Sequence, residues 1–211
     1  MFRLIKKAIN LSLRKGINQR NRQRLHNQTP TIIASNCNGA FIAHDLGLQF
    51  RSPFVNLYLS SQDFIQYLQH IDDYRNAPLH FIANPNGAYP LAKLNDLTIH
   101  FMHYHSEQEA QQKWQQRSQR MDLNNCFLMM TDRDGCTEQD LIAFDQLPYP
   151  HKVVFTHKSY PHIQSSYYLA DFANQTQVGD LFEFSGWNGK KYYDQFDYVN
   201  WFNQSEKNND I

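Results

Sequence analysis

Three side chains with reactive or hydrogen-bonding groups follow directly on the apolar segment from Thr31 to Ala34: Ser35, Asn36 and Cys37. The apolar segment predicts a buried strand and the segment from Phe41 predicts a helix, so these side chains would lie at the carboxyl end of a strand and face a helix N-terminus. The free N–H groups of a helix start suit an anion or an oxyanion. Ser35 or Cys37 is therefore a candidate nucleophile, and the helix N-terminus would lower the pKa of the Cys37 thiol.

The amides of this segment are candidate ligand-binding groups. Asn36 and the N–H groups near Gly39 could bind an oxyanion, while Asn38 and His44 could contact substrate. His44 comes two helical turns after Cys37, roughly 10 Å away, which is too far for direct proton transfer. A second interpretation stays open, in which the cysteine is a small buried residue and a polar residue before it caps the helix.

Three histidines are candidates for the general base. His103 and His105 would share one face of the strand predicted over 97–104, roughly 7 Å apart, a spacing that suits acid–base chemistry or metal ligation. His157 follows another predicted strand, and with its neighbour Lys158 it could also bind substrate. Two histidines alone are weak evidence, and ordinary polar packing is the favoured explanation of the first pair.

The triplet Asp132-Arg133-Asp134 has the Asp-x-Asp form with which nucleotide-sugar glycosyltransferases hold a divalent cation. Carboxylate oxygens are the ligands that Mg²⁺ and Mn²⁺ prefer. The alternative is a strand-to-helix turn in which the two aspartates close the loop and Gly135 relaxes the backbone. The triplet is short and common, so the turn is favoured. In the acyl-transfer interpretation, Asp132 or Asp134 would orient the histidine base.

The rest of the chain predicts strands that alternate with helices, which indicates a three-layer α/β/α domain with a mostly parallel or mixed sheet. The predicted strands are 32–34, 53–59, 79–83, 97–104, 126–131, 152–156 and 167–170. Capping signals start helices at Ser60, Ser106 and Thr137, and a terminal helix is predicted over 192–202. Because the carboxyl ends of parallel strands share one edge of a sheet, the polar clusters should converge there. The predicted domain is 29–203, followed by a frayed tail at 204–211.

The first 28 residues form a basic segment with apolar residues at helical spacing. Eight of the 20 basic residues lie in the first 24 positions, and the first acidic residue is Asp45. Such a helix could dock on the domain with its cations in water, which we favour, or contact an anionic membrane surface. The rest of the chain carries an excess of acidic residues and lacks a basic stripe, which argues against nucleic acid as a partner.

Composition predicts a cytoplasmic location. No apolar run approaches the roughly 20 residues that span a bilayer, and the N-terminus lacks the pattern of a secretory signal. The three cysteines, Cys37, Cys126 and Cys136, are widely spaced and odd in number, which favours reduced thiols over a disulfide framework. The basic segment leaves open a location at the periphery of the inner membrane.

Several motifs resemble those of a bacterial family of exopolysaccharide biosynthesis proteins, domain of unknown function 1919. The motifs are Ser35-Asn36-Cys37-Asn38-Gly39, His44-Asp45, Ser52-Pro53-Phe54, His103-Tyr104 with Ser106-Glu107 and Trp114, Thr131 to Thr137, and Phe155-Thr156 with Lys158 and Tyr160-Pro161. The resemblance covers about residues 31–202 and implies an α/β fold and a role in capsule or other surface-polysaccharide assembly. At Ala40 the family would be expected to have a second glycine.

The start of this segment also resembles, more loosely, polysaccharide acetyltransferases that carry Gly-Asn-Cys-Gln and bind coenzyme A. We therefore favour an acyltransferase, with acetyl-CoA as donor, that modifies a saccharide or glycolipid precursor. One alternative is a metal-dependent glycosyl- or phosphosugar transferase that uses Asp132-Arg133-Asp134. Another is a non-catalytic subunit of the assembly complex.

Overall fold

A four-stranded parallel sheet lies at the centre of the computed structural model, which describes residues 2–85 and 87–204. Its strands are β1 (Thr31–Ala34), β5 (Cys126–Thr131), β6 (Lys152–Thr156) and β7 (Ser166–Tyr168), in the order β1-β5-β6-β7. All three neighbouring pairs are parallel. The polar segments that follow β1, β5 and β6 therefore leave the same edge of the sheet, as the sequence predicted.

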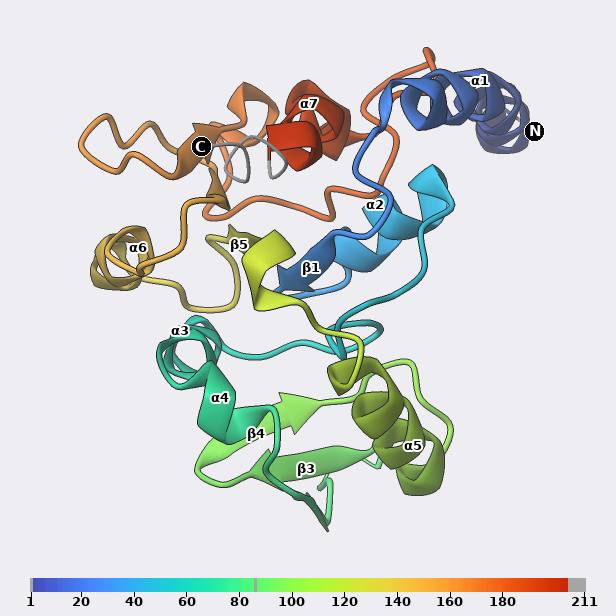
Figure 1. Cartoon of the computed structure of the whole chain (residues 1–211). Helices are drawn as coiled ribbons and strands as arrows, with labels where there is room; N and C mark the ends of the chain where they lie inside the picture. The colour runs from blue at the N-terminus through green and yellow to red at the C-terminus, as the bar shows by residue number, and fades with distance from the viewer. Residues whose placement is uncertain (1, 86, 205–211) are drawn as a thin grey trace.

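Alternate residues of each strand enter two separate hydrophobic cores, because successive side chains point to opposite faces of a sheet. Ile33 and Leu128 pack with α3 (Ser61–Gln69) and α6 (Glu138–Asp145) on one face. Ile32 and Phe127 pack with α2 (Asn38–Leu46) and α7 (Tyr198–Phe202) on the other face. Helices thus cover both faces of the sheet, and the predicted α/β architecture is confirmed (Figure 1).

The three predicted helix starts are confirmed by their caps. The Ser60 hydroxyl accepts a hydrogen bond from the N–H of Asp63 at 3.1 Å, before α3. The Ser106 hydroxyl does the same for Glu109 before α5 (Glu107–Ser118), and Thr137 forms a full capping box before α6. These caps depend on residues three apart, so the sequence alone can predict them.

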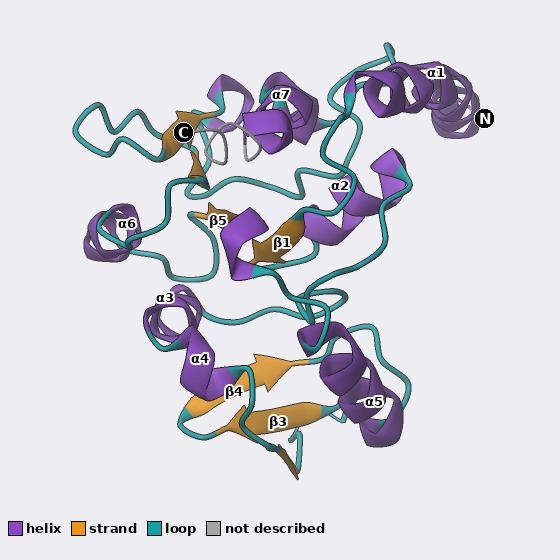
Figure 2. Cartoon of the chain, viewed as in Figure 1, coloured by secondary structure: helices purple, strands orange, loops and turns teal. Residues whose placement is uncertain are grey.

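A second, antiparallel sheet is formed by β2 (Leu79–Ile82), β3 (Leu91–Leu94) and β4 (Leu97–His100), next to α5 and the short α4 (Ile71–Tyr74) (Figure 2). The predicted strand over 97–104 therefore ends at His100 and lies outside the parallel sheet, and β3 was not predicted. The predicted extended segment 53–59 contributes one isolated bridge, from Tyr58 to His100.

The N-terminal helix α1 (Phe2–Arg24) contacts α2 and α7.

The terminal helix predicted over 192–202 is divided into the 3-10 turn η3 (Tyr192–Gln195) and α7. Two further 3-10 turns are η1 (Leu123–Asn125) and η2 (Ala170–Phe172). Among the described residues, none of the helices combines the length and the apolar character needed to cross a bilayer. Most of the predicted tail at 204–211 lies outside the described residues.

Candidate functional site

A pocket of about 420 Å³ lies at the carboxyl edge of β1 and β5. Three segments that are far apart in the sequence supply most of its wall: the loop after β1, the loop after β5 and the turn after β4. Its lining residues are Asn36, Cys37, Asn38, Tyr58, Met102, His103, Arg133, Asp134, Asp180 and Phe182. Six of the residues predicted from the sequence therefore meet in one cavity. We refer to this cavity as the edge pocket.

The edge pocket contains one guanidinium and two carboxylates. Arg133 forms an ion pair with Asp180, and its Nε atom is buried with no hydrogen-bond partner among the described residues. Asp134 adopts a left-handed backbone conformation with φ of 58°, and its N–H donates to Gln177 at 3.0 Å. Because carboxylates outnumber the guanidinium, the pocket favours neutral polar ligands over phosphates.

The asparagine side chains on either side of Cys37 have different roles. The Asn36 amide donates to the Thr131 hydroxyl at 2.8 Å and accepts from the N–H of Asn38 at 3.1 Å. These bonds fix the loop after β1 to the end of β5. Asn38 is 3% exposed, and its side-chain oxygen has no hydrogen-bond partner within the described part of the chain. Since an unpaired buried acceptor costs about 1–3 kcal/mol, Asn38 is a natural acceptor for a ligand N–H or O–H.

Cys37 lines the edge pocket, but its thiol is not activated. Burial raises the pKa of Cys37 above its ordinary value, the carboxylate of Asp180 raises it further, and Arg133 lowers it. The expectation that the helix N-terminus would lower this pKa is therefore wrong in direction, because desolvation has the larger effect. Cys37 keeps its proton at neutral pH and can donate a weak hydrogen bond.

Asp132 and His157 form a buried pair beside the edge pocket and do not line it. One carboxylate oxygen of Asp132 accepts from the backbone N–H of His157 at 2.7 Å and contacts its Nδ1 atom at 2.5 Å. The other oxygen accepts from the N–H of Val178 at 2.9 Å. Asp132 therefore orients His157, not His103 or His105 as the sequence suggested.

The Asp-x-Asp triplet does not present two carboxylates to one ion. Asp134 faces the edge pocket, whereas both oxygens of Asp132 are used by His157 and Val178. Residues 2–85 and 87–204 contain no group of three or more histidine, cysteine, aspartate or glutamate side chains that could hold a metal. The donor set for a cation that the triplet suggested is not assembled.

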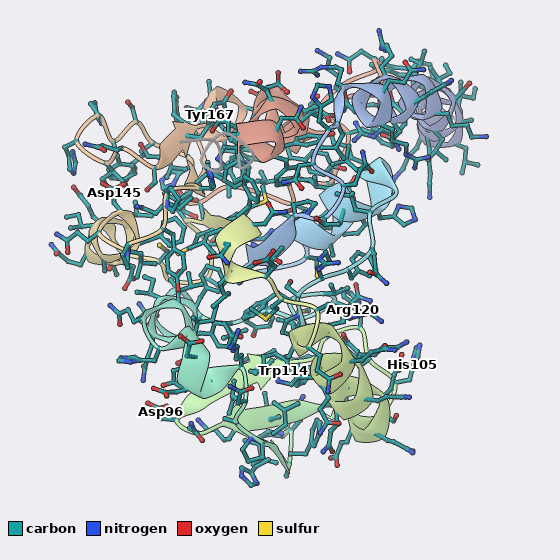
Figure 3. All side chains as sticks on the ribbon, viewed as in Figure 1. Asp96, His105, Trp114, Arg120, Asp145 and Tyr167 are labelled. Atoms are coloured by element: carbon teal, nitrogen blue, oxygen red, sulfur yellow. The ribbon has the colours of Figure 1, made fainter. Side chains whose placement is uncertain are left out.

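Besides Asp132 and His157, five further predicted residues lie outside the edge pocket. Ser35 is buried, and its backbone bonds to Met129 and Leu59. A Cβ on Gly39 would come within 2.8 Å of Ala34, so this glycine lets α2 pack closely on β1. The remaining three, His44, His105 and Lys158, are exposed. In Figure 3 the His105 side chain lies at the outer surface beside α5.

Four residues of the edge pocket were not predicted: Tyr58, Met102, Asp180 and Phe182. Tyr58 stacks on His100 with ring centroids 4.3 Å apart, and Phe182 stacks on Phe41 at 4.2 Å. Burial, together with neighbours that include Tyr89 and Asp134, raises the pKa of Tyr58 to about 12, so its hydroxyl stays protonated. The aromatic rings give one side of the pocket an apolar surface.

Comparison with known proteins places the whole of the edge pocket within a family. Residues 8–203 match a domain of unknown function, DUF1919. An uncharacterized protein of Haemophilus influenzae is 61% identical over 204 residues, which cover 97% of this chain and 98% of that protein. A role in exopolysaccharide synthesis is not part of either description and stays a prediction. Because the family match includes every strand and every residue of the pocket, the chain belongs to the DUF1919 family.

Proposed function

We propose that this protein acts in surface-polysaccharide biosynthesis as an acyltransferase, and that the edge pocket binds a neutral saccharide. The observation that carries this proposal is the composition of the pocket, which combines amides, carboxylates, a guanidinium and aromatic rings. Sugar hydroxyls both donate and accept hydrogen bonds, so they can pair with the free oxygen of Asn38 and with Asp134. The apolar faces of Tyr58 and Phe182 suit the C–H face of a sugar ring.

In the proposed reaction the acyl group passes directly to the sugar, without an acyl-enzyme. A sugar hydroxyl loses its proton to His103 while its oxygen attacks the carbonyl of a thioester such as acetyl-CoA. The tetrahedral intermediate then collapses, the C–S bond breaks, and the thiolate takes the proton from the imidazolium. Direct transfer fits a Cys37 thiol that keeps its proton and a Ser35 side chain that lies outside the edge pocket. The product is an ester on the saccharide.

A soluble or lipid-linked saccharide on the cytoplasmic side would be the acceptor, and nucleic acid is not proposed as a partner. The metal-dependent glycosyltransferase alternative receives less support, because Asp132 is committed to His157. A non-catalytic glycan-binding subunit would use the same pocket without turnover. These alternatives differ in the ligands they require, so binding measurements separate them.

The first test compares thermal shifts with acetyl-CoA and with nucleotide sugars plus Mn²⁺. A ligand that binds only the folded state raises the melting temperature, and the rise grows with the ratio of the ligand concentration to its Kd. We expect a shift with acetyl-CoA alone. A shift that needs both a nucleotide sugar and the metal would overturn acyl transfer.

The second test uses the cellular readout of ester-linked acetyl groups on surface polysaccharide. His103→Gln should reduce acetylation by about 10²–10⁴-fold, as is typical for loss of a general base. His44→Gln is the matched control, because His44 is an exposed histidine outside the pocket and should leave acetylation unchanged. Equal acetylation in the two variants would remove His103 from the mechanism.

A further inference from the structure

Helix α1 packs on the rest of the protein through polar side chains. Its buried residues are Asn10 and Arg14. Asn10 donates to the carbonyl of Gly186 at 2.8 Å and accepts from the N–H of Gly189 at 2.9 Å, and Arg14 forms ion pairs with Asp45 and Asp194. A surface helix usually buries its apolar stripe, so this packing is inverted.

The apolar stripe of α1 points into solvent instead. Phe2, Ile5, Ile9 and Leu13 recur at helical spacing, and their exposed fractions are 78%, 48%, 41% and 46%. Trp187, 45% exposed, joins this stripe, because its ring meets that of Phe2 edge-on with centroids 5.6 Å apart. We call these five residues the N-terminal face. Asn10 holds the loop that carries Trp187, so the face is preformed.

Cations lie beside the N-terminal face. Arg3, Lys6 and Lys7 have no ion-pair partner among the described residues, and α1 contains no acidic residue. A second pocket of about 470 Å³ lies beneath this part of α1. Its lining residues are Arg3, Lys6, Lys7, Asn10, Leu11, Phe182, Glu183, Phe184 and Lys191. Lys191 is already paired with Asp45, but Arg3, Lys6 and Lys7 outnumber the one carboxylate of the lining, Glu183, which suits the pocket to a phosphate group.

We propose that the N-terminal face docks on the surface of a bilayer that contains anionic phospholipid. A lipid phosphate would then lie in the pocket lined by Arg3, Lys6 and Lys7, which we call the cationic pocket. Exposed aliphatic side chains beside unpaired lysines and arginines are the pattern of an interfacial helix. Trp187 adds a ring of the type that concentrates at the membrane–water interface. A second copy of this chain fits less well, because two such faces would bring their cations together.

This docking does not depend on acyl transfer, but it bears on which saccharides reach the edge pocket. Phe182 lines both the cationic pocket and the edge pocket. A lipid phosphate in the first would therefore lie one aromatic side chain away from a sugar in the second. On this geometry the acceptor saccharide is linked to a membrane lipid.

The test is flotation of the full chain with vesicles of phosphatidylcholine alone and of phosphatidylcholine mixed with phosphatidylglycerol. We expect binding to the mixed vesicles only, weakened by added salt. Lys6→Gln with Lys7→Gln should weaken binding by about 5-fold for each lysine. Ile5→Ser with Ile9→Ser should also weaken binding to the mixed vesicles, because these variants remove two apolar side chains that would insert at the boundary between lipid headgroups and acyl chains.

Two controls match these variants in chemistry but not in position. Ile82→Ser replaces an isoleucine that is 40% exposed on β2, and Lys113→Gln replaces a lysine on α5; both elements lie far from α1 (Figure 1). Neither should change vesicle binding, and all variants should keep the melting temperature. Equal binding to both vesicle types, or no effect of the α1 variants, would overturn the proposal. A thermal shift with pyrophosphate that needs Lys6 and Lys7, without vesicle binding, would also overturn it in favour of a soluble phosphate ligand.

Discussion

The Cys37 thiol shows how burial and neighbouring charges together set the chemistry of a single residue. Burial and the Asp180 carboxylate raise its pKa, while Arg133, which is ion-paired to Asp180, opposes them. The side chain at the start of α2 is therefore a neutral donor in an acidic pocket, which is why the proposed reaction takes the substrate hydroxyl as its nucleophile.

Alkylation should report this balance. Cys37 should react with iodoacetamide more slowly than free cysteine at neutral pH, because the thiolate is the reacting form. Asp180→Asn should speed the reaction, by up to tenfold for each unit by which the pKa falls. Peptide mass spectrometry resolves Cys37 from Cys126, which is buried. Asp73→Asn, at an exposed carboxylate on α4, is the control and should leave the rate unchanged. A rate that is the same in both variants would contradict this account.

Residue types after strands identified six residues of the edge pocket, but not the direction of every side chain. Asp132 and Asp134 look equivalent in the sequence, yet one binds His157 and the other faces the pocket. The left-handed backbone at Asp134 breaks the regular alternation, and no residue pattern predicts that turn in detail. Asp180 and Phe182 lie in a segment without regular secondary structure, where periodicity gives no signal.

Helices were easier to predict than strand pairing, because caps are local and sheets are not. The hairpin between β3 and β4 did have a local signal. Leu91–Leu94 and Leu97–His100 are separated by two residues, Asn95 and Asp96, and Asn95 has φ of 54°. An asparagine in a two-residue connection favours a tight hairpin. This signal pairs Leu97–His100 with Leu91–Leu94 in an antiparallel hairpin, which places the predicted strand 97–104 outside the parallel sheet.

The buried ion pairs of Arg14 fasten α1 to the domain. Burial alone would raise the pKa of Asp45, but the Tyr193 hydroxyl, Arg14 and Lys191 outweigh it and lower the pKa to about 2. A carboxyl whose pKa is lower in the folded state than in the unfolded state stabilises the fold above the unfolded pKa. This stabilisation is present above about pH 4, where the unfolded group is ionised, and is lost as the pH falls towards 2.

Arg14→Met should therefore reduce the free energy of unfolding by about 3–5 kcal/mol at neutral pH, because it removes the cation that Asp194 pairs with and leaves the buried Asp45 with Lys191 alone. The difference from wild type should narrow between about pH 4 and pH 2. Urea denaturation across this pH range measures both effects. Arg24→Met is the control on the same helix: its ion pair with Asp197 is about half exposed and should cost at most about 1 kcal/mol. Equal losses of unfolding free energy in the two variants would show that the buried ion pairs of Arg14 do not stabilise the fold more than the exposed pair of Arg24.

The molecule as a whole has two cores that the parallel sheet keeps apart. Ile33 and Leu128 are paired in register on one face, whereas Phe155 belongs to the other face and lies two strands from Ile33. Substitutions that share a core should interact energetically, and those on opposite faces should not.

Double-mutant cycles test this separation. Ile33→Val should cost about 0.5–1.5 kcal/mol, Leu128→Ala about 2–5 and Phe155→Ala about 3–5. The pair Ile33→Val with Phe155→Ala should be additive within about 0.5 kcal/mol, and Ile33→Val with Leu128→Ala should deviate by more. Urea denaturation supplies the free energies. Strong coupling across the sheet would show that the two cores behave as one.

The contacts that hold α1 cannot all form until late in synthesis, because some of its partners lie near the other end of the chain. Asn10 bonds to Gly186, 176 residues further along the chain, and Arg14 bonds to Asp194, 180 residues further along. A ribosome adds about 5–20 residues per second, so α1 emerges roughly 9–35 s before its partners exist. During that interval Arg14 can pair with Asp45, only 31 residues further along, but Asn10 lacks Gly186 and Arg14 lacks Asp194, and the apolar stripe is already exposed. The loop that carries Trp187 is made at the end of this interval, so the complete N-terminal face forms only when translation is nearly finished.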